Sequence, residues 1–185
     1  MAAEVKRIAG VELVKTGVWE VSNCTWTVTP SDIAAMVDSF KSGAVRKPPI
    51  KIGHVDERFD GEPTFGFVDK LRATDKGHTL VGDLVLPAWL ADAAPMYYPE
   101  RSVEAAYDYD DGQGTIWPLA LTALALLGER GPGITSLRSL QDLVAASAGR
   151  RVSLTTTGAS WPHTDHRTTI LIAAARRRRN QRKVL

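Results

Sequence analysis

The chain has 185 residues, of which 44% are hydrophobic and 24% are charged, which favours one domain with a core of its own. A single cysteine, Cys24, excludes an internal disulfide. The longest apolar run, residues 119–127, is far below the roughly 20 residues of a membrane span, so we expect no membrane contact. The net charge of +2 is uneven, because residues 150–185 contain nine Lys or Arg and one acid.

The first quarter of the chain predicts two short strands and a helix. Residues 11–14 and 25–28 have strand character around a turn near residues 22–23. Thr29, Pro30 and Asp32 form a helix start, and Ser42-Gly43 ends the helix. The apolar face of this helix recurs at helical spacing and consists of Ile33, Met36, Val37 and Phe40.

The middle of the chain predicts a strand at residues 50–53 that leads to His54, followed by a polar loop at residues 55–63. Residues 64–73 and 78–86 predict two strands around the turn at residues 75–77. A short helix at residues 87–94 begins at a proline.

The last folded part predicts a hairpin and a helix. Strands at residues 101–109 and 115–127 flank the turn Asp110-Asp111-Gly112, and residues 119–127 are apolar enough for burial on both faces. Ser136 caps a final helix with Leu137, Leu140, Leu143 and Val144. We therefore expect an α+β fold in residues 1–149, mainly antiparallel sheet flanked by helices, and a basic, flexible tail in residues 150–185.

Three polar residues could carry chemistry. His54 lies where a strand enters a loop, and histidine is the usual general base near neutral pH. Ser102 and Glu104 share one face of a strand because their spacing is two. If these residues converge, Ser102 is the nucleophile, His54 its base and Glu104 the group that orients the imidazole.

Several alternatives remain open from the sequence. His54 and Ser102 also fit ordinary surface and strand positions. Asp56, Asp108 and Asp110 compete with Glu104 for the third role. The oxyanion could be bound by the backbone of Gly53 or of residues 101–102.

Other chemistry is less well supported. Cys24 has no histidine close in sequence, and His163 and His166 lack further zinc ligands, so we expect no metal and no cofactor. The arginine-rich tail could contact nucleic acid or an acidic surface weakly, but it has no interleaved aromatic residues to stack on bases.

The order of several motifs resembles the Mu-like prophage protease/scaffold family, whose relatives are capsid maturation (prohead) proteases of tailed phages. The resemblance covers about residues 10–145 and is strongest over residues 47–128. The motifs are PPIKIGH (residues 48–54), FDGEPTFGFVD (59–69), LVGDL (80–84) and YPERSVE (98–104), after Val18-Trp19 and Thr27–Ile33.

This resemblance implies a β-barrel-like sheet wrapped by helices, as in herpesvirus assemblins, with a histidine and a later serine as catalytic pair. His54 and Ser102 match that order. It also implies a serine endopeptidase that cleaves scaffold and major capsid protein inside the procapsid, in the host cytoplasm, and that self-associates.

The chain departs from the family pattern, because residues 119–127 contain Thr122 but no acid, where related enzymes carry one. A catalytically inactive scaffolding or minor head protein is therefore the alternative. A nucleic-acid-binding packaging accessory, based on the tail alone, ranks third.

Overall fold

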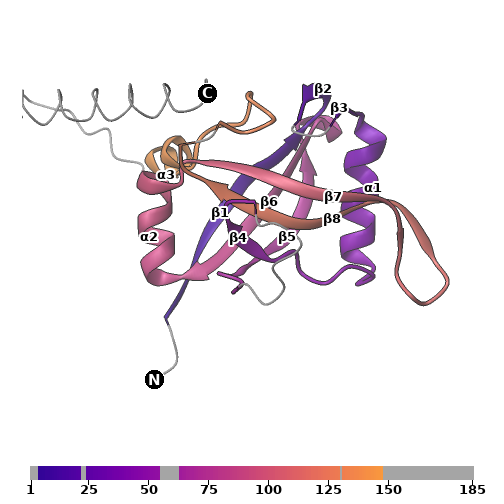
Figure 1. Cartoon of the computed structure of the whole chain (residues 1–185), viewed down its shortest axis with the longest axis horizontal. Helices are drawn as coiled ribbons and strands as arrows, with labels where there is room; N and C mark the ends of the chain where they lie inside the picture. Colours follow the sequence, from indigo (N-terminus) through magenta and orange to yellow (C-terminus); the bar gives the residue numbers. More distant parts are fainter. Residues whose placement is uncertain (1–3, 22–23, 55–62, 130, 148–185) are drawn as a thin grey trace, which may run out of the picture. The chain divides into compact units, whose positions relative to one another are not determined.

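The computed structural model describes residues 4–21, 24–54, 63–129 and 131–147. Within these residues the strands, in chain order, are β1 (Val5–Lys15), β2 (Gly17–Glu20), β3 (Thr25–Val28), β4 (Ile50–Ile52), β5 (Phe67–Thr74), β6 (Thr79–Pro87), β7 (Glu100–Asp110) and β8 (Ile116–Leu127). The helices are α1 (Pro30–Lys41), α2 (Ala88–Tyr97) and α3 (Leu140–Ser147), with a short 3-10 turn at Asp75–Gly77. The predicted α+β class is confirmed (Figure 1).

The strands form three sheets, with the orders β1-β6-β5, β2-β3 and β4-β8-β7. All pairs are antiparallel except β4 with β8, which is parallel. The described strands form three separate sheets and no closed barrel. An isolated antiparallel bridge joins Pro49, just before β4, to Phe67 at the start of β5. Backbone hydrogen bonds from Val68 to Pro48 and from Ile50 to Gly66 flank this bridge.

Helix α1 follows the sequence prediction closely. Its N-cap, Thr29, accepts a hydrogen bond from the Asp32 backbone, and the Asp32 side chain accepts one from the Thr29 backbone. This reciprocal pair satisfies two N–H groups that the helix itself leaves open. Ile33, Met36 and Val37 are buried against the sheet that contains β8.

The hairpin of β7 and β8 is also confirmed. Asp110 Oδ1 accepts a hydrogen bond of 2.8 Å from the Gly112 backbone, which closes the predicted turn. Strand β8 is buried over most of residues 119–127, and helix α1 packs against it. It is the central strand of its sheet and holds β4 and β7 on its two sides.

Several local predictions are wrong in the partners or the bounds of their elements. Strand β3 pairs with β2, which the sequence did not predict, and β1 extends well beyond residues 11–14 to pair with β6. Strand β5 begins at Phe67 rather than at residue 64. Helix α2 runs one turn past Ala94 and includes Pro95, and α3 begins at Leu140 rather than after Ser136.

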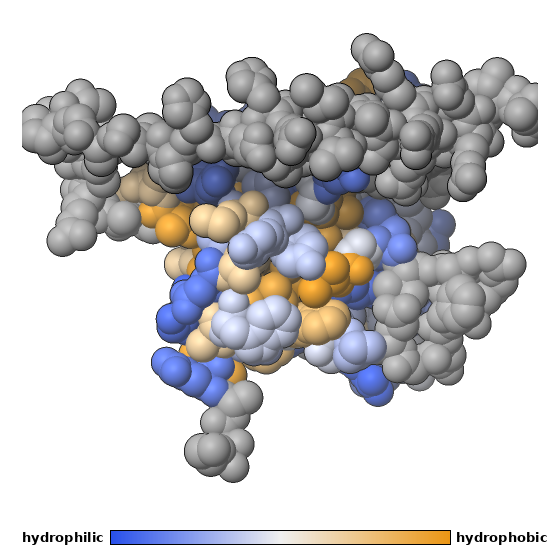
Figure 2. Space-filling view, turned by 60° about the vertical axis from the view of Figure 1, so that its left-hand side comes forward, coloured by the Kyte–Doolittle hydropathy of each residue, from blue (hydrophilic) through white to orange (hydrophobic). Residues whose placement is uncertain are grey.

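Helix α2 leaves apolar side chains exposed. Trp89, Met96 and Tyr97 lie on it at a spacing of seven and eight residues, and each is at least 60% exposed. Figure 2 shows this side of the molecule, where orange and pale residues lie between blue ones.

Among the described residues, no helix has the length and apolar character needed to cross a membrane. The basic tail lies outside the described residues, so its predicted flexibility stays a prediction.

Candidate functional site

The sheet β4-β8-β7 brings the candidate residues to one face. Its register places Lys51 beside Ala125 on β8, and Ala125 beside Ser102 on β7. Side chains in one such row point to the same side of a sheet. Glu104, two residues after Ser102, points to that side as well.

Glu104 is the centre of a charged cluster. Its Oε2 atom lies 2.9 Å from Nζ of Lys51, and its Oε1 atom lies 3.4 Å from Nδ1 of His54. The Glu104 side chain is 32% exposed and that of His54 is 46% exposed. The cluster is therefore open enough to receive a ligand, and the carboxylate is shared between two partners.

Gly53 makes this approach of His54 possible. Its φ is +73°, a left-handed conformation that ends β4 and that a residue with a Cβ rarely adopts. Its N–H donates to the carbonyl oxygen of Leu126 at 2.9 Å. Because this N–H is used inside the sheet, residues 101–102 are the remaining candidate for oxyanion binding.

The structure brings His54 and Glu104 into contact, and it places Ser102 in the same hollow. The half-buried Ser102 and His54 both line a cavity of about 880 Å³. No hydrogen bond joins His54 to Ser102 in the part of the chain that the structure describes. Because Glu104 contacts Nδ1 of His54, Nε2 is the ring nitrogen that could accept the Ser102 hydroxyl proton. Catalytic hydrogen bonds are often long or unformed before substrate binds.

The cavity is a groove along the free edge of β7. Every residue from Arg101 to Tyr107 lines it. A groove on one face of a strand would be lined mainly by every second residue, so this continuous lining indicates the strand edge. The other side of the groove includes Cys24 and Trp26, and Trp26 Nε1 donates to the Tyr107 hydroxyl at 3.0 Å. No described strand pairs with this edge of β7.

The other predicted candidates lie elsewhere or have other partners. Asp110 accepts the turn hydrogen bond from Gly112. Asp108 is exposed and does not line the groove, whose β7 residues end at Tyr107. Asp56 lies outside the described residues, as do His163 and His166. Thr122, at the place of the missing acid, lines the groove. The described residues contain no cluster of three or more metal-ligating side chains.

The side chains of two residues in this region, Lys51 and Arg101, were not among the predicted candidates. Lys51 is 53 residues from Glu104 in sequence, and the parallel pairing of β4 with β8 brings them together. Arg101 is fully buried, which is unusual for a charged residue. The alternation of β7 was the available signal, since it turns Arg101 away from the face of Ser102 and Glu104.

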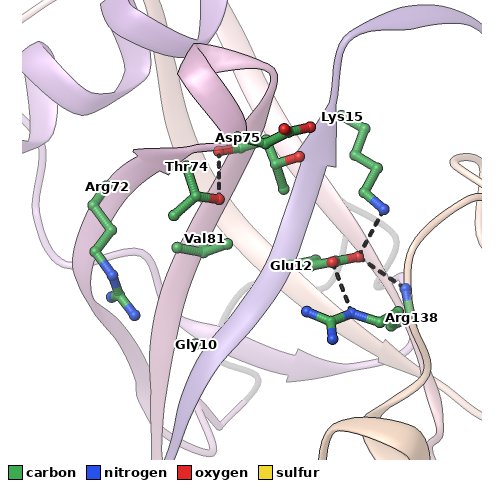
Figure 3. Close-up of a pocket in the computed structure, with 9 residues that line it drawn as sticks. Gly10, Glu12, Lys15, Arg72, Thr74, Asp75, Val81 and Arg138 are labelled. Carbon is green, nitrogen blue, oxygen red and sulfur yellow. Dashed lines mark hydrogen bonds and ion pairs between the residues drawn. The ribbon is translucent and has the colours of Figure 1, made fainter.

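A second, smaller hollow of about 420 Å³ lies over β1, β5 and β6. Figure 3 shows Glu12 there between Lys15 and Arg138, at 3.0 Å and 2.9 Å. Burial alone would raise the pKa of Glu12, but hydrogen bonds from the Arg138 backbone and from both side chains lower it below its ordinary value. Because both oxygens of the Glu12 carboxylate are bound by Lys15 and Arg138, we assign Glu12 a structural role.

No protein-family model, no curated protein and no solved structure matches this chain.

Proposed function

We propose that the chain is a serine endopeptidase of phage capsid maturation, which cleaves scaffold and capsid-protein extensions in the procapsid. The observation that carries the proposal is the contact of Glu104 with Nδ1 of His54, in a groove that Ser102 also lines. In a catalytic triad, a carboxylate binds one ring nitrogen of the histidine and the serine hydroxyl binds the other. Glu104, His54 and Ser102 offer these groups in that arrangement. The assemblin-like fold, self-association and location in the procapsid come from the motif resemblance and belong to the same proposal.

The chemistry requires no cofactor. Ser102 Oγ attacks the scissile carbonyl carbon while His54 Nε2 takes the hydroxyl proton. The proton then passes to the leaving amine, the C–N bond breaks, and an acyl-serine ester remains. Water hydrolyses this ester with His54 again as base. Glu104 keeps the imidazole oriented and stabilises its positive charge.

The free edge of β7 supports binding of an extended peptide. Its unpaired N–H and C=O groups can form main-chain hydrogen bonds with an added strand. Such a strand would pass directly beside Ser102, which is itself on β7. The groove therefore favours an unfolded linker or terminal extension as substrate, rather than a folded surface.

Covalent labelling tests the nucleophile without knowledge of the substrate. We expect a fluorophosphonate to modify Ser102, because activated serine oxygen forms a bond to phosphorus and fluoride leaves. Peptide mass spectrometry locates the adduct, and labelling should vanish in His54→Ala. Labelling of other serines at the same rate as Ser102, or unchanged labelling in His54→Ala, would contradict the proposal.

Replacing Lys51 with methionine is expected to slow the labelling of Ser102. Nζ of Lys51 lies 2.9 Å from Oε2 of Glu104 and holds this carboxylate in place. Without Lys51 the carboxylate can turn away from Nδ1 of His54, so the imidazole is less well oriented toward Ser102. The rate of Ser102 labelling at neutral pH measures the effect.

Two variants separate this effect from a general loss of charge. Lys51→Arg keeps the cation and should keep the parental labelling rate, whereas Lys41→Met removes an exposed cation of α1 and should change nothing. A Lys51→Met labelling rate equal to that of the parent would show that Lys51 does not position Glu104 for catalysis.

A catalytically inactive head protein is the second candidate. It is favoured by the missing hydrogen bond between Ser102 and His54 among the described residues and by the missing acid at Thr122. It predicts no Ser102 labelling at any pH. The third candidate, a nucleic-acid-binding accessory, depends on the tail outside the described residues, and salt-dependent DNA binding lost on truncation at Gly149 would support it.

A further inference from the structure

Arg101 is a buried cation whose hydrogen bonding is incomplete. The residue has 0% exposure, and its Nε atom donates to the Glu12 carbonyl oxygen at 2.6 Å. Its Nη1 and Nη2 atoms have no hydrogen-bond partner. Buried polar groups are almost always satisfied, and a charged group left without partners is especially costly. The unpaired side of this guanidinium therefore requires an explanation.

No acid of the described residues forms a hydrogen bond with the terminal nitrogens of Arg101. The charges of Glu100 and Glu12 favour the charged guanidinium, but neither side chain binds Nη1 or Nη2, and both oxygens of the Glu12 carboxylate already bind Lys15 and Arg138. Burial holds the pKa of Arg101 down to about 10, so the guanidinium still carries its charge at neutral pH. The charged guanidinium therefore keeps two donor atoms without an acceptor.

The location of Arg101 indicates where that charge comes from. Arg101 lines the groove beside β7 and directly precedes Ser102. A peptide added to the edge of β7 places alternate side chains on the two faces of the sheet. Some of its side chains would therefore lie on the Ser102 face, and their neighbours on the Arg101 face.

We propose that Arg101 is a specificity residue that binds a carboxylate of the peptide in the groove, one or two residues from the scissile bond. The position relative to the scissile bond rests on the proposed function, because only a protease has a scissile bond. Binding of the carboxylate itself does not require catalysis. Arginine suits the role because its planar guanidinium can donate two parallel hydrogen bonds to one carboxylate. The carboxylate belongs to an acidic side chain or to the free end of a chain.

Burial shapes how this site works. Because Arg101 has no exposed surface, the peptide must displace neighbouring side chains of the groove to reach it. Once bound, the ion pair is shielded from water, which strengthens it and makes a neutral side chain a poor substitute. Discrimination between glutamate and glutamine should therefore be large.

Peptide binding to the full chain carrying Ser102→Ala tests the inference without cleavage. The probes are acetylated, amidated heptapeptides of alanine, serine and valine, in which one Glu is moved through all positions, each with a Gln twin. A further peptide has a free C-terminal carboxylate. Isothermal titration should show at least about tenfold tighter binding for Glu than for Gln at one position, or for the free over the amidated end. These two results distinguish the sources of the carboxylate.

Arg101→Met in the same background should abolish that preference, whereas Arg46→Met, an exposed arginine away from the groove, should retain it. We expect Arg101→Met to melt no lower than its parent, because it removes an unpaired buried charge. Arg101→Lys, which keeps a charge without the planar fork, should retain a reduced preference and serves if the methionine variant fails to fold.

Three results would overturn the inference: equal binding of every Glu and Gln pair with no gain from the free end, a preference that survives in Arg101→Met, or no peptide binding up to millimolar concentration. Failure of the protease proposal would look different. Ser102 of the parent chain would not be labelled by the fluorophosphonate, while the Ser102→Ala variant would still bind Glu peptides more tightly than Gln peptides.

Discussion

Ser102→Ala is expected to stop cleavage of the phage scaffold and major capsid protein when the three proteins are co-expressed. Loss of the nucleophile from a serine triad costs on the order of 10⁴- to 10⁶-fold in rate, because no other group forms the acyl intermediate. Mass spectrometry of the two head proteins measures the processed fraction. The variant should fold and assemble like the parent, since Ser102 has no side-chain hydrogen bond within the described residues.

The same assay can show whether Ser102 and His54 act as a unit. Each single replacement by alanine should cost nearly as much as the double replacement, because residues of one catalytic unit are strongly non-additive. Ser136→Ala removes an exposed hydroxyl that does not line the groove and is the matched control. Processing at the parental rate in Ser102→Ala would remove it as nucleophile, and Cys24→Ser would then test the other nucleophile that lines the groove.

Local signals in the sequence predicted the parts of the fold that depend on neighbouring residues. The cap at Thr29 and the turn at Asp110 each involve partners within three residues, so their chemistry is visible in the sequence. The partners of β1 and β4 lie more than 60 residues away, and no local pattern specifies them. The pairing of β2 with β3 was missed because the strand at residues 25–28 was predicted but its partner β2, Gly17–Glu20, was not.

The candidate site shows the same division. His54, Ser102 and Glu104 were found because a strand end and a spacing of two are local features. Lys51 and Arg101 gain their roles from tertiary structure: Lys51 through the register of three strands, and Arg101 through burial beside β1. Charged residues are seldom fully buried, so only the alternation of β7 could have indicated the burial of Arg101.

Gly66→Ala is expected to destabilise the chain by about 3 kcal/mol or more. Gly66 has a φ of +144°, and a Cβ at this position would collide with the backbone carbonyl oxygen of Val85 on β6. A backbone obstacle of this kind cannot rotate away, so β5 and β6 would have to separate. Urea unfolding followed by circular dichroism measures the free energy of unfolding.

The substitution should also lower activity under conditions where the chain remains folded. The Gly66 carbonyl oxygen accepts a hydrogen bond of 2.9 Å from the Ile50 N–H, which anchors β4 just before Lys51 and His54. A shift of this strand would move His54 away from Glu104, so Ser102 labelling should fall together with stability. Gly131→Ala is the matched control, because nothing lies within 4 Å of its added Cβ, and its stability should stay within about 0.5 kcal/mol of the parent. A Gly66→Ala variant as stable as Gly131→Ala would mean that the close contact of β5 with β6 does not exist as described. A destabilised variant with undiminished labelling would mean that the position of β4 does not control His54.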